Sequence, residues 1–289
     1  MDQFDPKVLA QLYRPPKDSH KGQNGKLLLI GGSQLFHAAS MWSLEVASRI
    51  VDMVFYFSVP VNEAIVKKQK ERFHDGIVVP QGEVETYLGE ADCVLIGPGM
   101  ERGKETEEKT NKLLKKYPDK RWVIDGGALQ MMDPGLLNER MIVTPHLREL
   151  RGLIDRSGRK LLISKSEFLN KFKFSKDQIS KMADFLEDFS KVYGGATVVL
   201  KGPTDVVCDA KQCVLNVTGN EGMTKGGTGD VLAGLVAALY CKSPAFLAAS
   251  CGVYLNGLAG DRLYSLVGAY FNASDLVHEI PKVMAEVLG

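Results

Sequence analysis

The sequence predicts an α/β protein with three layers, α/β/α, in which helices cover both faces of a mostly parallel sheet. Short, wholly apolar runs alternate along the chain with longer stretches of helical character. Apolar runs that end in Gly, Pro, Asp or Thr are typical of strands buried on both faces of a sheet. The predicted strands span residues 26–30, 53–59, 76–79, 93–96, 122–124, 141–143 and 197–200.

Helices are predicted between and after these strands. Helical spacing or composition covers residues 38–50, 104–116, 145–154 and 176–193. After residue 200 the pattern changes to a hairpin, 205–208 and 213–217, and three helices rich in small residues then close the chain. The polar, Lys-rich stretch 155–177 is the only plausible excursion. We therefore expect one domain over residues 1–289, without internal repeats.

Composition excludes several classes of protein. With 289 residues, 45% hydrophobic and 25% charged, the chain has the profile of an ordinary soluble protein with a large core. Its net charge of +1 gives no electrostatic case for binding nucleic acid or membranes. Residues 1–19 are polar, so they predict no signal peptide, and the apolar run 231–241 is too short to cross a bilayer.

The cysteines suggest neither a disulfide framework nor a zinc site. The five, Cys93, Cys208, Cys213, Cys241 and Cys251, are an odd number and form no Cys-x-x-Cys pair. A reducing compartment, the cytoplasm, fits this usage best.

A glycine-dense turn before an apolar helix is the most informative motif. Gly226, Gly227, Thr228 and Gly229 lead into the run 231–239. Glycines allow unusual backbone conformations and close approach of a ligand, and free N–H groups at a helix start attract anions. The spacing matches neither the P-loop nor the Rossmann fingerprint. We expect these four residues to form an anion hole in another kind of nucleotide fold.

Asp230 follows this turn directly. A carboxylate repels an anion unless it has a function there, such as taking a proton from an attacking hydroxyl. Asp is also among the residues preferred at the N-cap of a helix. The residues alone leave catalysis and capping open.

Five strand ends carry Gly, Pro or polar residues, at positions 31–33, 97–100, 125–127, 144–146 and 201–205. Each alone is more often a simple turn. Ligands of open α/β sheets bind outside the carboxyl ends of the strands, so we expect these tips to meet Asp230 in one crevice.

In this order, the motifs resemble those of the ADP-dependent (S)-NAD(P)H-hydrate dehydratases, which have a ribokinase-like fold. The motifs are Lys21-Gly22-x-x-Gly25-Lys26, Ile30-Gly31-Gly32-Ser33, Gly97-Pro98-Gly99, Thr144-Pro145-His146-x-x-Glu149, Leu200-Lys201-Gly202, Gly219-Asn220-x-Gly222-Met223 and Gly226-Gly227-Thr228-Gly229-Asp230. The resemblance covers residues 19–288. The last motif and Thr-Pro-His are specific to the family, whereas Gly-x-Gly-Asp alone marks the wider ribokinase-like kinases.

The resemblance implies repair of the S-form of hydrated NADH and NADPH, driven by conversion of ADP to AMP and phosphate, with Mg²⁺ as cofactor and ATP as a substitute for ADP. The hydroxyl of the damaged ring would be phosphorylated and then lost as phosphate. Asp230 would be the general base, and the anion hole would hold the phosphoryl group. The resemblance also implies a homotetramer. The chain has no room for the epimerase domain often fused in this family, so a separate epimerase is expected.

Other site residues follow from the resemblance position by position. Substrate would contact Ala38, Gly99, His146 and Asp230. The nucleotide would contact Lys201, Gly202, Pro203, Thr204, Asp205 and Gly229. His146, which opens a helix, is expected to face the substrate and not the nucleotide. The simpler alternatives are a helix-start residue at His146 and a solvated lysine at 201. No residue is identified as a metal ligand.

The chain departs from the family pattern at several places, which leaves substrate affinity and nucleotide preference open. His37 and Glu101 replace glycines, Gly127 lacks a carboxylate often found after Asp125, and Asp205 stands where threonine is frequent. Two other functions remain. A ribokinase-like kinase acting on a vitamin-precursor alcohol would use the same base and anion hole, although Thr144-Pro145-His146 argues against it. A non-catalytic nucleotide-binding protein would not need Asp230.

Overall fold

The computed structural model describes residues 1–156 and 176–289, and in these residues ten strands form one sheet. The strand order is β1-β10-β9-β8-β7-β6-β5-β2-β3-β4. The strands are β1 (Asp2–Gln3), β2 (Lys26–Ile30), β3 (Met53–Phe57), β4 (Ile77–Val78), β5 (Cys93–Ile96), β6 (Arg121–Ile124), β7 (Met141–Val143), β8 (Thr197–Leu200), β9 (Asp205–Cys208) and β10 (Cys213–Asn216). Each predicted strand is confirmed within two residues at either end. The two-residue β1 was not predicted because it carries no apolar run.

The sheet is mostly parallel, as predicted. All neighbours from β8 to β4 pair in parallel, and β9 is antiparallel to both β8 and β10. After β1, which pairs with β10, the chain forms β2, adds β3 and β4 on one side of it, and then returns to place β5, β6, β7 and β8 on the other. The switch point of the topology therefore lies between β2 and β5, where α/β sheets open a crevice.

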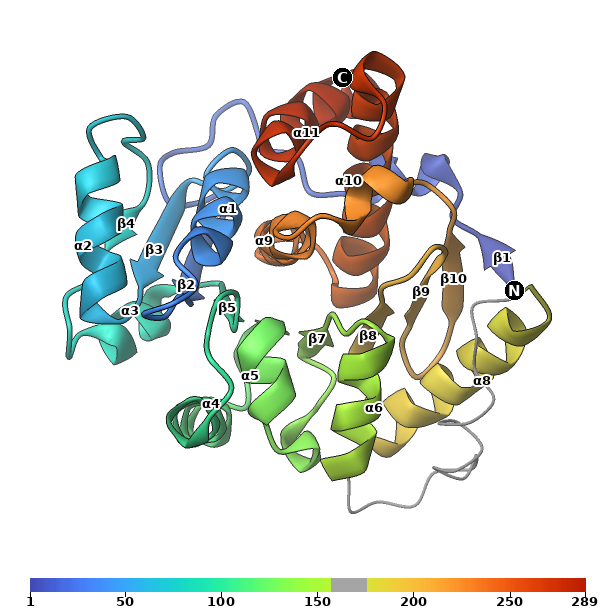
Figure 1. Cartoon of the computed structure of the whole chain (residues 1–289), viewed down its shortest axis with the longest axis horizontal. Helices are drawn as coiled ribbons and strands as arrows, with labels where there is room; N and C mark the ends of the chain where they lie inside the picture. Colours follow the sequence, from blue (N-terminus) through green and yellow to red (C-terminus); the bar gives the residue numbers. More distant parts are fainter. Residues whose placement is uncertain (157–175) are drawn as a thin grey trace.

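Helices cover both faces, which confirms the three layers. Figure 1 shows α1, α9, α10 and α11 on one side of the sheet and α4, α5, α6 and α8 on the other. The α-helices are α1 (Ala38–Ala47), α2 (Pro60–Gln69), α3 (Val84–Glu90), α4 (Lys104–Lys116), α5 (Gly126–Met131), α6 (Leu147–Arg156), α8 (Lys176–Val192), α9 (Thr228–Tyr240), α10 (Ala245–Val267) and α11 (Ala273–Leu288). Short 3-10 helices are η1 (Pro6–Gln11), η2 (Pro134–Leu136) and η3 (Glu221–Thr224).

Strand β2 shows how one apolar run supplies two cores. Successive side chains of a strand point to opposite faces. Leu27 and Leu29 belong to the core cluster that includes residues of α1, α9, α10 and α11, whereas Leu28 and Ile30 belong to the cluster that includes residues of α4, α5, α6 and α8. All four are essentially buried, so none of these four positions tolerates a polar side chain without a hydrogen-bond partner.

The sequence missed three short helices. Helix α2 follows β3 almost directly and has Pro60 in its first turn, α3 has only seven residues, and α5 begins with two glycines. Helices this short draw their stability from packing more than from propensity. The stretch 155–177, predicted as an excursion, lies mostly outside the described residues.

One local disulfide is present, although the cysteine count and spacing indicated no disulfide framework. Cys208 and Cys213 face each other in the β9–β10 pairing and are joined by a disulfide. A turn of four residues places them opposite each other, a local arrangement that a search for Cys-x-x-Cys or a cysteine framework does not detect. The free cysteines among the described residues, Cys93, Cys241 and Cys251, are buried.

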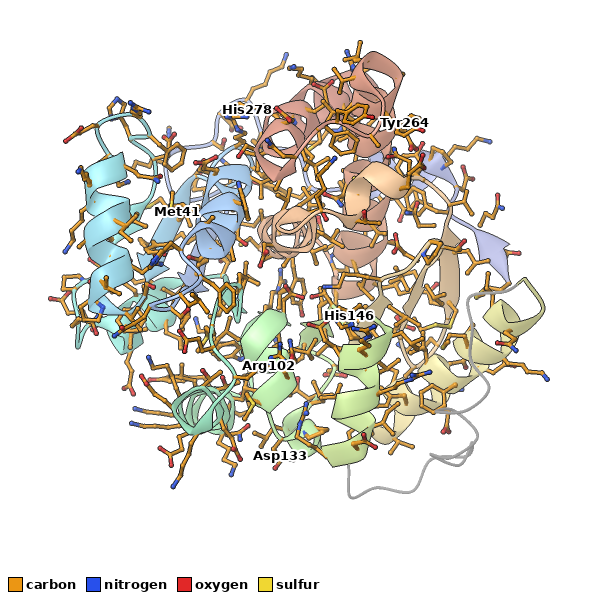
Figure 2. The ribbon with its side chains drawn as sticks, in the orientation of Figure 1. Met41, Arg102, Asp133, His146, Tyr264 and His278 are labelled. Carbon is orange, nitrogen blue, oxygen red and sulfur yellow. A yellow bond between two sulfur atoms is a disulfide. The ribbon has the colours of Figure 1, made fainter. Side chains whose placement is uncertain are left out.

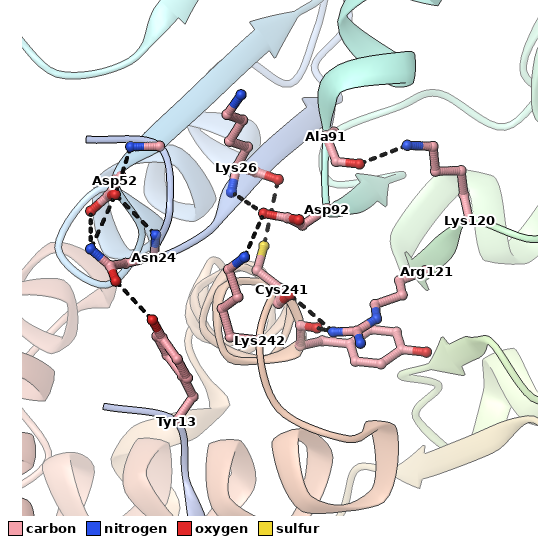
Figure 3. Close-up of polar contacts among 12 residues, drawn as sticks. Tyr13, Asn24, Lys26, Asp52, Ala91, Asp92, Lys120, Arg121, Cys241 and Lys242 are labelled. Atoms are coloured by element: carbon pink, nitrogen blue, oxygen red, sulfur yellow. Dashed lines mark hydrogen bonds and ion pairs between the residues drawn. The ribbon is translucent and has the colours of Figure 1, made fainter. Parts of the chain in front are cut away.

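Residues at the amino-terminal ends of the strands hold the carboxyl-terminal end of α9. Figure 3 shows Arg121 donating hydrogen bonds to the carbonyl oxygens of Tyr240 (2.7 Å) and Cys241 (2.9 Å). Asp92 accepts from the backbone N–H of Lys26 at 2.9 Å and lies 3.5 Å from Lys242 Nζ. A cation at the last carbonyls of a helix complements the helix dipole. The end of α9 is therefore held against β6. In the part of the chain described, every helix is too short or too polar to traverse a bilayer.

Candidate active site

The predicted glycine turn lies at the start of α9. Gly227 is the N-cap, with φ of +98°, and a Cβ there would be 2.3 Å from the Trp42 ring. Glycine is required at 227 for both reasons. Gly226 and Gly229 do not have positive φ, so the expectation that all three need unusual conformations is correct only for Gly227. A Cβ at Gly229 would lie 3.4 Å from Lys201 Nζ, so glycine there keeps the lysine close to the helix start.

Thr228 can serve an anion hole only through its backbone. Its hydroxyl donates to the carbonyl oxygens of Met223 (2.6 Å) and Lys225 (3.0 Å), which turns the side chain toward η3. Gly229 and Asp230 are in the first turn of α9, where backbone N–H groups have no acceptor four residues earlier in the helix. Such N–H groups are suited to hold a phosphoryl oxygen.

Asp230 is not the cap of α9. It is the third helical residue, and Gly227 provides the N-cap without a side-chain hydrogen bond. Burial, and then the nearby carboxylate of Asp125, raise the pKa of Asp230 to about 7, against the opposing charge of Lys201. A carboxylate that titrates near neutral pH is well suited to general base catalysis. The geometry thus favours catalysis over capping.

Three charged side chains surround Asp230. Lys201 Nζ lies 3.0 Å from Asp125 Oδ1 and 3.9 Å from Glu149 Oε2. Burial alone would lower the pKa of Lys201, but the carboxylates of Asp125 and Glu149 raise it, so the ammonium group stays charged. Asp125 also accepts a hydrogen bond from the Thr144 hydroxyl at 2.6 Å. Sequence reasoning noted Asp125 and Glu149 within motifs but missed this cluster. Because Asp125 and Glu149 follow the neighbouring strands β6 and β7, their positions could have predicted that they lie close together.

The predicted nucleotide segment, Lys201 to Asp205, forms the tight turn between β8 and β9. Asp205 accepts hydrogen bonds from the Gly202 N–H (2.9 Å) and from Asn216 Nδ2 (3.1 Å). Burial raises the pKa of Asp205 to about 6, although these two hydrogen bonds oppose the rise. Asp205 therefore stabilises its own turn, which accounts for an acidic residue at this place. Gly202 and Pro203 remain exposed.

His146 caps the start of α6, a role that the sequence analysis gave only as the simpler alternative. Its Nδ1 accepts hydrogen bonds from the N–H groups of Arg148 and Glu149, both at 3.1 Å, and Glu149 Oε2 accepts from the His146 N–H at 2.9 Å. This reciprocal pattern caps α6 in the manner of a capping box. Figure 2 shows His146 at the end of α6 nearest α9.

The backbone of His146 lies next to the nucleotide segment, and the expectation that its side chain faces the substrate stays a prediction. His146 forms a parallel bridge with Lys201, and the Lys201 N–H donates to Pro145 O at 2.8 Å. The two segments extend β7 and β8, which are neighbours, so they stay adjacent beyond the strand ends. The half-exposed imidazole has its Nε2 3.6 Å from Glu149 Oε2.

Ala38 and Gly99 follow β2 and β5 in the sequence. Gly99 has φ of +72°, and a Cβ there would be 2.8 Å from Phe36 O and 3.2 Å from Gly32 Cα. Ala38 is the exposed first residue of α1, directly after this loop. The structure thus places His146 and Lys201 after β7 and β8, and Ala38 and Gly99 after β2 and β5. Asp230 also contacts α1, because the Ser43 hydroxyl donates to Asp230 O at 2.7 Å.

Between these groups, the loops after the strands approach each other so closely that the glycine positions leave no room for a side chain. A Cβ on Gly97 would be 1.7 Å from Asp125 O, one on Gly31 would be 2.5 Å from Pro98 O, and one on Gly127 would be 2.1 Å from Met100 O. The last distance explains why Gly127 lacks the carboxylate common in the family, because any side chain there would strike the Met100 backbone. The departure at His37 is accommodated by a hydrogen bond of 3.0 Å between His37 Nδ1 and Asn62 Oδ1.

A cavity of about 300 Å³ continues the crevice at the tips of β2 and β3. Among residues 1–156 and 176–289, no group of three or more His, Cys, Asp or Glu side chains is arranged to hold a metal ion. This is compatible with Mg²⁺ that one or two carboxylates and a nucleotide hold together.

A family model for NAD(P)H-hydrate dehydratase matches residues 27–282. The chain belongs to this family. It is 36% identical over 286 residues to the bifunctional NAD(P)H-hydrate repair enzyme Nnr of Methanocaldococcus jannaschii, covering 96% of this chain but 51% of that protein. The chain therefore spans about half the length of this relative. It is 32% identical to the ADP-dependent (S)-NAD(P)H-hydrate dehydratase of Nitrosopumilus maritimus, covering 96% and 95% of the two chains.

Solved structures confirm the fold. A ribokinase-like superfamily protein of Enterococcus faecalis superposes with a TM-score of 0.79 at 23% identity, over 99% of this chain and 96% of the other. The ADP/ATP-dependent NAD(P)H-hydrate dehydratase of Bacillus subtilis, co-crystallised with ATP/Mg²⁺, superposes with a TM-score of 0.77 at 22% identity, over 99% and 98%. The predicted ribokinase-like α/β fold is correct.

Proposed function

We propose that this protein dehydrates the S-form of hydrated NADH and NADPH and couples the reaction to the conversion of ADP to AMP and phosphate. Family membership supports the reaction class. The single structural observation that carries the proposal is Asp230, a carboxylate with a pKa of about 7 at the start of a glycine-capped helix. That position suits a base acting on a hydroxyl beside a phosphoryl group.

In this proposal Asp230 takes the proton from the ring hydroxyl, whose oxygen attacks the β-phosphorus of ADP as AMP leaves. The first-turn N–H groups of α9 and the ammonium group of Lys201 hold the phosphoryl oxygens, where negative charge grows. The phosphate then leaves the ring together with a proton from the neighbouring carbon, which restores the double bond. Phosphorylation is needed because hydroxide itself is a poor leaving group.

Mg²⁺, when bound, would neutralise charge on the nucleotide phosphates. Asp125 and Glu149 fit this role because they are the carboxylates nearest Lys201 and Asp230. Mg²⁺ usually binds through one or two carboxylates plus substrate phosphates. Lys201 to Asp205 and Gly229 would take the nucleotide, and ATP would serve in place of ADP.

The decisive experiment incubates the purified protein with (S)-NADH-hydrate, ADP and Mg²⁺ and records absorbance at the NADH band together with free phosphate. Recovery of NADH with one phosphate released per molecule, and its loss in Asp230→Asn, would support the proposal. The kinase alternative makes a different product. A stable phosphate ester of a hydroxymethylpyrimidine or thiazole alcohol, without restored NADH, would replace the dehydratase proposal.

We also propose a homotetramer in the cytoplasm, working with a separate epimerase that supplies the S-form. The small residues of α10 pack within the chain, for example Gly252 against Val236 and Gly260 against Met223, so they do not serve the assembly. Support for assembly comes from the end of α10 and the following loop, where Leu266 and Tyr270 are 70% and 92% exposed. Light scattering that gives a single species near the chain mass of 31.7 kDa would exclude the tetramer.

A further inference from the structure

The cavity of about 300 Å³ lies at the topological switch point of the sheet. Its lining comes from the tips of β2 and β3, from Met100 and Glu101 after β5, and from the first turns of α4. None of the residues assigned to the nucleotide or to the reacting hydroxyl lines it. A hollow at this place in an open α/β sheet is the usual location of a ligand.

The position of the cavity relative to Asp230 suggests which part of the substrate reaches it. ADP takes the β8–β9 side of Asp230 in the proposed function, on which this inference rests. The dinucleotide must then extend to the opposite side, along the tips of β6, β5 and β2. The ends of these strands are in close backbone contact at Gly97 and Gly31. Gly99 lies along the same path, where a Cβ would be 3.2 Å from Gly32 Cα. The path ends in the cavity, so the half of the dinucleotide remote from the nicotinamide would occupy it.

The charges around the cavity favour an adenosine half without a phosphate on its ribose. Two carboxylates, Glu101 and Glu105, and one ammonium group, Lys109, line it. Lys109 Nζ lies 5.5 Å from the centre of the Phe57 ring, a cation–π contact that keeps the ammonium group beside this ring, and the charged residues of the lining still sum to −1. The Thr106 hydroxyl donates to Glu101 O at 2.6 Å and ties the backbone of Glu101 to α4. Glu101 is also one of the departures from the family, which commonly has glycine there.

We propose that this cavity binds the adenosine ribose of the hydrated dinucleotide, and that Glu101 and Glu105 make the enzyme prefer hydrated NADH to hydrated NADPH. A carboxylate accepts a hydrogen bond from a free ribose 2′-hydroxyl, the arrangement by which many dinucleotide sites select NAD. A phosphate monoester at that position brings a charge of about −1.5 to −2. Beside two carboxylates, that charge is repelled.

The test compares kcat/KM for (S)-NADH-hydrate and (S)-NADPH-hydrate in wild type, Glu101→Gln, Glu105→Gln and the double variant. Each substitution is expected to raise the NADPH-hydrate to NADH-hydrate ratio about tenfold, because it removes one like charge a few ångströms from the phosphate. The KM for ADP should not change, because the nucleotide turn is on the other side of Asp230. Glu108→Gln is the matched control. Its carboxylate is on α4 but pairs with Lys104 at 3.6 Å, outside the cavity lining.

Direct binding separates this inference from the proposed function. Titration of the wild type with NADH and with NADPH, followed by calorimetry without ADP, needs no turnover. Tighter binding of NADH, with the preference reduced by Glu101→Gln and Glu105→Gln but not by Glu108→Gln, supports the inference even if hydrates are not turned over. Equal affinities for NADH and NADPH, or a preference that the two variants leave unchanged, would overturn it even if the dehydratase assay succeeds.

Discussion

Replacing Asp230 by Asn should abolish turnover and at the same time stabilise the protein above neutral pH. The folded-state pKa of Asp230 is raised from 3.8 to about 7, mainly by burial. As pH rises from 3.8, the unfolded chain ionises this carboxyl first, so the folded state loses stability relative to it until about pH 7. Asparagine has no charge to desolvate, and the variant lacks this loss.

The size of the effect follows from the pKa. A rise from 3.8 to about 7 corresponds to an upper bound of about 4 kcal/mol of unfolding free energy. Asp230 keeps some contact with solvent, so we expect roughly half, about 2 kcal/mol, at pH 8. For a chain of this size that raises Tm by about 4 °C. Near pH 4 the two proteins should be equally stable.

Thermal and denaturant unfolding of wild type and Asp230→Asn at pH 4, 6 and 8, beside the activity assay, measures this directly. Asp119→Asn, at an exposed position on the opposite edge of the sheet, is the control and should show no pH-dependent difference. A variant that is less stable than wild type at pH 8, or whose stability difference does not vary with pH, would refute the reasoning. It would mean that Asp230 contributes a favourable interaction as a charged group.

Three further outcomes are expected. Lys201→Met removes a charge that lowers the pKa of Asp230, so the acid limb of the kcat profile should move up by about one pH unit; an unchanged limb would show the two groups to be uncoupled. His146→Ala should cost about 1 kcal/mol of stability through the lost cap, and His146→Asn should restore it; if both variants also raise KM for the hydrate, the imidazole contacts substrate. Gly127→Ala should destabilise by at least about 2 kcal/mol in denaturant titrations because its Cβ would meet Met100 O at 2.1 Å; a neutral or stabilising result would contradict the close approach.

The sequence was most informative where a local pattern has one physical solution. Apolar runs such as 93–96 and 197–200 can be covered on both faces only inside a layered sheet, and they are β5 and β8. The turn 226–230 was predicted as an anion site at a helix start, and Gly227 and Asp230 occupy those positions. Capping by Asp230 is excluded because Gly227 is the N-cap, whereas its role as a base stays a prediction, supported by burial and by Asp125, which is distant in sequence.

The features that the sequence did not predict depend on which strand ends become neighbours in the folded sheet. The contact of Lys201 with Asp125 joins residues 76 positions apart, and no spacing rule encodes it. His146 was assigned from a motif, but its Nδ1 is engaged by the helix that it opens. The Cys208–Cys213 pair was missed although it is local, because only the hairpin register sets the two residues opposite each other. Ala38 and Gly99 remain predictions as substrate contacts.

The side-chain-free contacts between the strand tips have a consequence for engineering new specificities. Gly31, Gly97 and Gly127 each leave no room for even a methyl group, so the segments that carry them cannot be varied one at a time. Libraries directed at these positions should yield mostly unfolded protein. Variation at Glu101, Glu105 and Lys109, whose side chains project from the loop and helix after β5, changes the charge of the cavity and leaves the backbone unchanged. The fold thereby separates positions that evolution can use to tune the substrate from positions that it must keep.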